Sequence, residues 1–98
     1  MERRQAFMIR LCSDKAAYEA VPKRRLRVDL AKLRRSLERD GDCEIALWTR
    51  QLMVVRRRDA TEITIVDDGR LIIRNVANEK VAQSTADALM PKLAVSKR

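Results

Sequence analysis

Lys and Arg side chains give this sequence its clearest capacity for binding chemistry. The segment KRRLRVDLAKLRR (residues 23–35) holds seven basic residues and one acidic residue, and RQLMVVRRR (50–58) holds four basic residues and none that is acidic. The whole chain of 98 residues has a formal net charge of +8. Residues 1–40 carry 12 basic and 6 acidic residues, a net of +6, and residues 41–98 carry 10 and 8, a net of +2. This charge favours acidic partners, either phosphodiesters or anionic proteins.

Groups suited to catalysis or metal binding are scarce. The chain has no histidine, the residue that general acid–base catalysis uses most often. Cys12 and Cys43 do not form a CxxC pair, and without histidine the usual zinc ligand sets cannot be assembled within one chain. We interpret both cysteines as free thiols packed as small apolar groups. Gly41 and Gly69 are the only glycines, too few for a P-loop or Rossmann loop, so we expect no enzyme activity, no catalytic residues, no cofactor and no metal.

The most regular segment is ITIVDDGRLIIRNV (63–76), which predicts a β-hairpin. Apolar, β-branched residues that alternate with a period of two are typical of half-buried strands. The dipeptide Asp68-Gly69 suits a two-residue type I′ turn. We expect the core face of the hairpin to carry Ile63, Ile65, Leu71 and Ile73. The opposite face would then carry Glu62, Thr64, Val66, Arg70, Ile72 and Arg74.

Three further strands are predicted upstream of this hairpin. EIALWT (44–49) and QLMVVRR (51–57) are apolar stretches that we assign to the same antiparallel sheet, without deciding which face of the second stretch is buried. KRRLRV (23–28) is expected to form a short first strand.

Two helices are predicted from their caps and periodicity. VDLAKLRRSLERDG (28–41) begins at the N-cap Asp29 and ends at Gly41, with Leu30, Leu33 and Leu37 buried. In NEKVAQSTADALMPKL (78–93) the helix begins at the N-cap Asn78, and Pro91 should end or kink it near Met90. Its apolar face carries Ala82, Ala86, Leu89 and Leu93.

Residues 1–22 are interpreted as an N-terminal extension, and residues 23–98 as a single α+β domain. The segment QAFMIRLC alternates as a strand does, but the same region also places Phe7, Leu11 and Tyr18 on one helical face. We favour a strand followed by a short helix that begins near Ser13. The region lacks a signal-peptide core, and no apolar run is long enough to span a membrane, so we expect a cytoplasmic protein that does not enter membranes.

The predicted fold class is α+β. From residue 23 onward the expected order is β-α-β-β-β-β-α, with helices packed on one face of an antiparallel sheet. In this order, LMVVRRRDATEITIVDDGRLIIRNVANEKVAQSTADALM (52–90) resembles one repeat of the TATA-box-binding protein: apolar strands, a turn ending in Gly-Arg, and a helix rich in small residues.

This resemblance implies a DNA-binding scaffold. The family holds two repeats in one chain, so a homodimer of this chain would restore the pseudo-twofold arrangement. The family also inserts phenylalanines between base pairs to kink DNA. Here Val66 stands at the matching position and residues 23–98 contain no phenylalanine, so we do not expect such kinking.

Together these features predict a small non-enzymatic basic module that binds DNA or RNA with low sequence selectivity. With only Phe7, Tyr18 and Trp48 as aromatic residues, stacking on single-stranded bases is not expected. The candidate contacts with backbone phosphates are Lys23, Arg24, Arg25, Arg56, Arg57, Arg58, Arg70 and Arg74. The alternative is a protein-interaction module or accessory subunit that uses apolar residues of the open sheet face: Val54, Val66 and Ile72.

Overall fold

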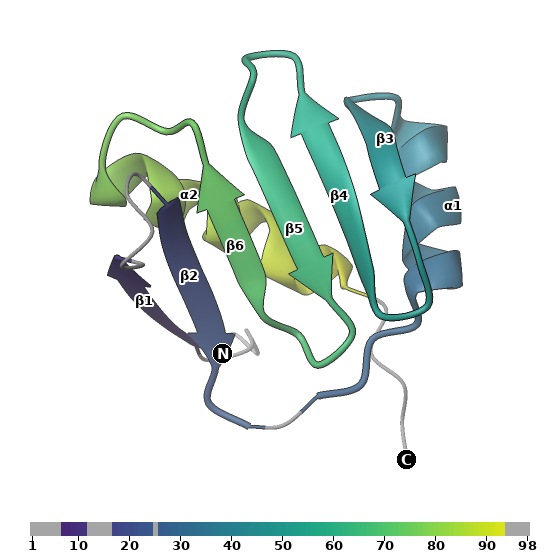
Figure 1. Cartoon of the computed structure of the whole chain (residues 1–98), viewed down its shortest axis with the longest axis horizontal. Coiled ribbons are helices and arrows are strands. Elements are labelled where there is room, and N and C mark those ends of the chain that lie inside the picture. The colour runs from purple at the N-terminus through teal and green to yellow at the C-terminus, as the bar shows by residue number, and fades with distance from the viewer. Residues whose placement is uncertain (1–6, 12–16, 25, 94–98) are drawn as a thin grey trace.

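The computed structural model describes residues 7–11, 17–24 and 26–93 and shows the predicted α+β class (Figure 1). Six antiparallel strands form one sheet in the order β1-β2-β6-β5-β4-β3. Both helices lie behind this sheet in Figure 1: α2 crosses behind β2, β6 and β5, and α1 lies beside β3. The elements are β1 (Phe7–Leu11), β2 (Ala17–Pro22), α1 (Leu30–Asp40), β3 (Cys43–Trp48), β4 (Leu52–Arg57), β5 (Glu62–Val66), β6 (Leu71–Arg74), α2 (Glu79–Leu89) and the short 3₁₀ helix η1 (Met90–Lys92).

The core lies between the sheet and the two helices. The four hairpin residues expected to point inward are buried, and so are Met53 and Val55 of β4. The buried face of β4, which the sequence did not determine, is therefore the one that carries Met53 and Val55. The predicted stripes of α1 and α2 are buried against these residues. Burying one such aliphatic side chain contributes about 1.5–3 kcal/mol, so this layer supplies most of the stability.

Local signals fixed the helix ends as predicted. The Asp29 carboxylate accepts a hydrogen bond from the Lys32 amide at 3.1 Å, and the Asn78 side chain accepts one from the Val81 amide at 3.0 Å. Gly41 ends α1 in the left-handed conformation (φ +72°). Pro91 lies in η1, so α2 ends at Leu89, close to the expected position.

The turn between β5 and β6 is longer than predicted. It contains three residues, 67–69, because Val66 and Arg70 close it with a 2.9 Å hydrogen bond from the Val66 amide. The Gly69 amide donates to the Val66 carbonyl at 2.9 Å, and Gly69 alone in this loop has a positive φ, +98°. This is a type I turn followed by a glycine bulge. This turn needs a left-handed backbone only at Gly69. The expected type I′ turn would also need one at Asp68, where a side chain makes that conformation strained.

The N-terminal part of the chain differs from the prediction in two respects. Residues 7–11 form the expected strand, but 17–22 form strand β2 where a short helix was expected; 13–16 lie outside the described residues. The expected strand at 23–28 is reduced to Val28, whose amide donates to the Asp67 carbonyl at 2.8 Å. Pairing with both β1 and β6 gives β2 hydrogen bonds along both edges, and this non-local pairing overrides the local helical pattern. Both strands of the expected extension 1–22 thus belong to the same sheet as β3–β6.

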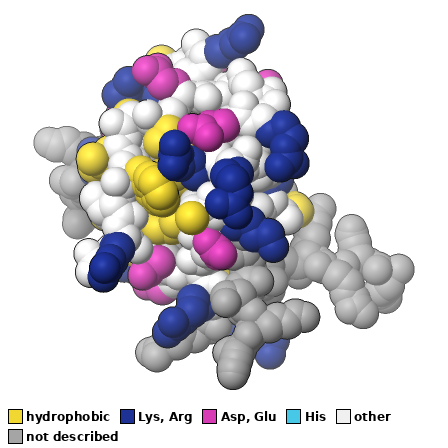
Figure 2. Space-filling view, turned by 90° about the vertical axis from the view of Figure 1, so that its right-hand side faces the viewer, with side chains coloured by type: hydrophobic (Ala, Val, Ile, Leu, Met, Phe, Trp, Pro, Cys, Tyr) yellow, Lys and Arg dark blue, Asp and Glu magenta, His cyan; other side chains and the backbone are white. Residues whose placement is uncertain are grey.

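The face of the sheet opposite the helices carries two cross-strand rows. One row is mostly apolar and runs across β3, β4, β5 and β6 as Leu47, Val54, Thr64 and Ile72. The other alternates in charge across the same strands as Glu44, Arg56, Glu62 and Arg74. Figure 2, which looks onto the side formed by β3 and α1, shows hydrophobic side chains gathered in one patch among Lys, Arg, Asp and Glu.

Candidate nucleic-acid interface

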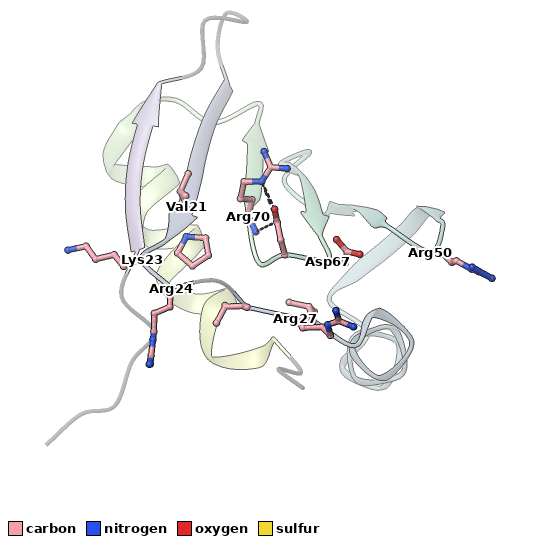
Figure 3. A pocket seen from close by; sticks show the side chains of 11 residues that line it. Val21, Lys23, Arg24, Arg27, Arg50, Asp67 and Arg70 are labelled. Atoms are coloured by element: carbon pink, nitrogen blue, oxygen red, sulfur yellow. Dashed lines mark hydrogen bonds and ion pairs between the residues drawn. The ribbon is translucent and has the colours of Figure 1, made fainter. Parts of the chain in front are cut away.

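A cavity of about 650 Å³ lies at the end of the sheet where β2 stops and the β5–β6 turn begins (Figure 3). Its apolar lining comes from the end of β2 and the segment that leads to α1: Val21, Pro22, Leu26 and Val28. Its charged lining comes from that segment and from the two turns beside it: Lys23, Arg24, Arg27, Arg50, Asp67, Asp68 and Arg70.

Backbone hydrogen bonds hold the three segments of this cavity together. The Asp67 carbonyl accepts from the Val28 amide at 2.8 Å, and the Asp67 amide donates to the Gln51 carbonyl at 2.9 Å. The β5–β6 turn therefore joins the segment before α1 to the β3–β4 turn. As a result, basic residues far apart in the sequence lie around one cavity.

Close packing beneath the turn depends on Gly69. A Cβ atom built on this glycine would lie 2.8 Å from Leu26 Cδ1 and 3.1 Å from Pro22 Cγ. Only a residue without a side chain therefore allows the turn to pack directly on the apolar lining of the cavity. The same glycine supplies the left-handed conformation that the turn requires.

Four exposed cations around this cavity form no ion pair within the part of the chain that the structure describes. We call them the rim cations: Lys23, Arg24, Arg27 and Arg50. Counting Arg70 as a fifth cation and subtracting Asp67 and Asp68, the cavity lining has a net charge of +3. The positive potential of this end of the molecule is therefore carried mainly by the rim cations.

Arg70, which was also predicted to contact phosphates, forms two ion pairs within the fold. Its Nε lies 3.0 Å from Asp68 Oδ2, and its Nη1 lies 3.3 Å from Glu19 Oε2. The hydrogen bond and charge of Asp68, with a smaller contribution from Glu19, raise the pKa of the Arg70 guanidinium. Arg70 therefore links β2 to the hairpin and contributes less than the rim cations to attraction of an outside anion.

The remaining predicted contacts lie at the opposite end of the sheet. We call them the far-end arginines: Arg56, Arg57, Arg58 and Arg74. Acidic residues accompany them, because Arg56 stands between Glu44 and Glu62 in the sheet register. Asp59 lies nearby, and its pKa is lowered by the Thr61 amide and hydroxyl and, to a smaller extent, by Arg57.

The structure thus divides the predicted contacts between two surfaces. Lys23, Arg24 and Arg70 lie at the cavity, the far-end arginines lie at the other end of β4, and Arg25 is outside the described residues. Strand β4 has six residues, which corresponds to about 20 Å between the two surfaces. Sequence reasoning missed Arg27 and Arg50 as contacts, although both belong to the basic runs that it singled out.

Cys43 has the properties of a packed thiol. It is free, half-buried and in contact with the core, and burial is the main cause that raises its pKa above the ordinary value. The thiol is therefore protonated at neutral pH, which is unfavourable for a nucleophile. Cys12 lies outside the described residues. Across residues 7–11, 17–24 and 26–93, no three Cys, Asp or Glu side chains gather in a way that could hold a metal ion.

Comparison of the chain with protein-family models, with curated proteins and with solved structures finds no match. Neither α1 nor α2, the α-helices of the described part of the chain, has the length and apolar character needed to cross a membrane.

Proposed function

We propose that this protein is a non-enzymatic module that binds the phosphate backbone of nucleic acid with low sequence selectivity. The observation that carries the proposal is the set of rim cations, which come from two separate segments and have no ion-pair partner among the described residues. Unpaired Lys and Arg side chains on one surface attract a polyanion and release its counterions on binding.

The directions of the rim cations favour an extended polyanion over a small anion. In Figure 3, Lys23 and Arg24 extend to one side of the cavity and Arg50 extends to the other. Because these side chains diverge, a single phosphate group cannot contact all of them at once. A chain of phosphates can pass from one cation to the next, which is the arrangement that a nucleic-acid backbone offers.

Low sequence selectivity follows from the chemistry of the lining. Contacts with phosphates set the position of a protein on nucleic acid, whereas sequence is read by groups that bind the edges of the bases. The uncharged lining of the cavity consists of Val21, Pro22, Leu26 and Val28, whose side chains offer no hydrogen bonds to base edges. The apolar part of the cavity therefore adds no hydrogen bonds that would distinguish one base from another.

A salt series tests this proposal. If the four rim cations each neutralise one phosphate, log K should fall with log salt concentration with a slope of about −2.8 for a single strand. Raising the salt from about 50 to about 200 mM should then weaken binding roughly 50-fold. Fluorescence anisotropy with labelled oligonucleotides of different sequence measures the affinity. Absence of binding at the lower salt concentration, or an affinity indifferent to salt, would refute the proposal.

A second candidate function is protein interaction through the open sheet face. The apolar row across β3–β6 favours it, because Leu47 is 51% exposed and Val54 and Ile72 are only half-buried beside it. Exposed apolar patches of this kind mark interfaces. If no nucleic acid binds in the salt series, this function becomes the better account of the molecule.

The resemblance of residues 52–90 to a TATA-box-binding-protein repeat, and the homodimer that it implies, stay predictions. The proposal that the rim cations bind phosphates does not depend on either, because one copy of the chain carries all four. A cytoplasmic location is likewise part of the proposal, since nucleic acid is available there.

A further inference from the structure

The surface of the cavity continues toward the single tryptophan of the chain. A second cavity, of about 490 Å³, shares Val28 and Arg50 with the first and is also lined by Trp48 and Thr49. The start of α1, at residues 29–31, forms its remaining side. One continuous surface therefore leads from the rim cations past Arg50 to an aromatic ring.

Trp48 is held in place but not covered. It is the final residue of β3, which is an edge strand of the sheet, and 42% of the residue is exposed. The guanidinium carbon of Arg34 lies 4.5 Å from the centroid of the Trp48 ring, and Arg34 Nε is 3.2 Å from Glu38 Oε2. A cation fixed over one side of the ring restricts its orientation, so the exposed part of the indole is presented in a defined direction.

The surroundings of Trp48 indicate what would cover it. Arg50 lines the same cavity as Trp48 and forms no ion pair among the described residues, whereas the charge of Arg34 is paired with Glu38 and Asp29 adds one carboxylate to the lining. The unpaired cation beside the ring, in line with the other rim cations, favours an anionic ligand over a neutral apolar protein surface. A nucleobase stacks on an aromatic side chain while its phosphates contact neighbouring cations. Bases inside a duplex already stack on one another, so only an unpaired base offers a free face.

Resting on the proposed function, we infer that the preferred ligand is single-stranded nucleic acid, with one base stacked on Trp48 and the adjoining phosphates on Arg50 and the other rim cations. The sequence argued against stacking, because aromatic residues are few. The structure places one partly exposed ring in the same cavity as Arg50, and one ring can stack one base. Every base has an aromatic face, so this contact keeps sequence selectivity low.

Intrinsic fluorescence tests this inference directly, because the chain contains one tryptophan. Addition of oligothymidylate of about 15 nucleotides should quench the Trp48 emission, and a duplex of equal length should leave it nearly unchanged. The substitution Trp48→Ala should weaken single-strand binding roughly 5- to 100-fold and leave duplex binding within about twofold. Leu47→Ala, which removes the neighbouring exposed apolar side chain, is the matched control and should leave both affinities unchanged.

A second variant keeps the test decisive if Trp48→Ala fails to fold. Trp48→Phe retains an aromatic face and should keep a measurable preference for the single strand over the duplex. Equal affinity for both forms, together with no effect of Trp48→Ala, would overturn the inference while leaving the proposed function in place. If the unaltered protein binds no nucleic acid at all, both the inference and the proposed function are overturned. Emission that changes with protein concentration alone would overturn the inference as well, because a second copy of the chain would then cover Trp48.

Discussion

Replacement of all four rim cations by alanine (K23A, R24A, R27A and R50A) is expected to weaken single-strand binding about 10²–10³-fold at about 0.1 M salt. The estimate follows from counterion release: each phosphate contact contributes about 0.7 logarithmic units of affinity for every tenfold fall in salt concentration. These side chains form no ion pair with the described residues and are exposed, so their removal should leave the fold intact. Anisotropy measures the affinity, and circular dichroism checks the fold.

The matched control removes arginines from the other end of the sheet (R56A, R57A and R58A). These charges are accompanied by Glu44, Asp59 and Glu62 and lie about 20 Å from the cavity, beyond the Debye length of about 10 Å at 0.1 M salt. The control variant should therefore lose less than about tenfold in affinity. If it loses as much affinity as the fourfold variant, the site has been placed at the wrong end of the sheet.

The substitution Gly69→Ala is expected to lower the stability of the fold more than the same change at Gly41, the other glycine of the chain. A left-handed backbone costs a residue with a side chain about 1–3 kcal/mol. At this position the added methyl group would also meet Leu26 at 2.8 Å and Pro22 at 3.1 Å, which forces the segment before α1 to move. Urea unfolding, followed by circular dichroism, measures the loss.

Gly41→Ala separates the two contributions. Gly41 also has a positive φ, +72°, but a Cβ atom there would meet nothing within 4 Å. Its substitution should therefore cost only the backbone contribution, about 1–3 kcal/mol, and less than Gly69→Ala. Equal losses for the two variants would show that the turn does not pack tightly against the cavity lining.

Local signals in the sequence were sufficient for most of the fold. The alternation of isoleucines in β5 and β6 predicted the buried face of the hairpin, and the capping residues Asp29 and Asn78 predicted both helix starts. These features depend on residues within a few positions of one another. They are therefore readable without knowledge of the tertiary structure.

Contacts between residues far apart in the sequence determined the features that local sequence patterns did not predict. β2 is a strand because it lies between β1 and β6, and β6 is more than 50 positions further along the chain. Arg70 was predicted to contact phosphates, but it binds Glu19, which is 51 positions away. A sequence displays how many charges a chain has, but only the fold determines which of them are neutralised.

The candidate site shows the same limitation. The basic runs 23–35 and 50–58 were identified from composition, but each contributes only its first residues to the cavity. The rest of each run continues along α1 or β4 to other surfaces. Trp48 was not predicted to stack on bases, because aromatic residues are few. The β3–β4 turn brings it into the same cavity as Arg50, which the sequence alone does not show.

The most direct test of the central claim is an NMR titration of the backbone amides of ¹⁵N-labelled protein with oligothymidylate. The account predicts that the largest shift changes fall in residues 23–28, 48–51 and 67–70, which surround the two cavities. Changes concentrated instead in residues 56–62, at the far end of β4, would contradict it.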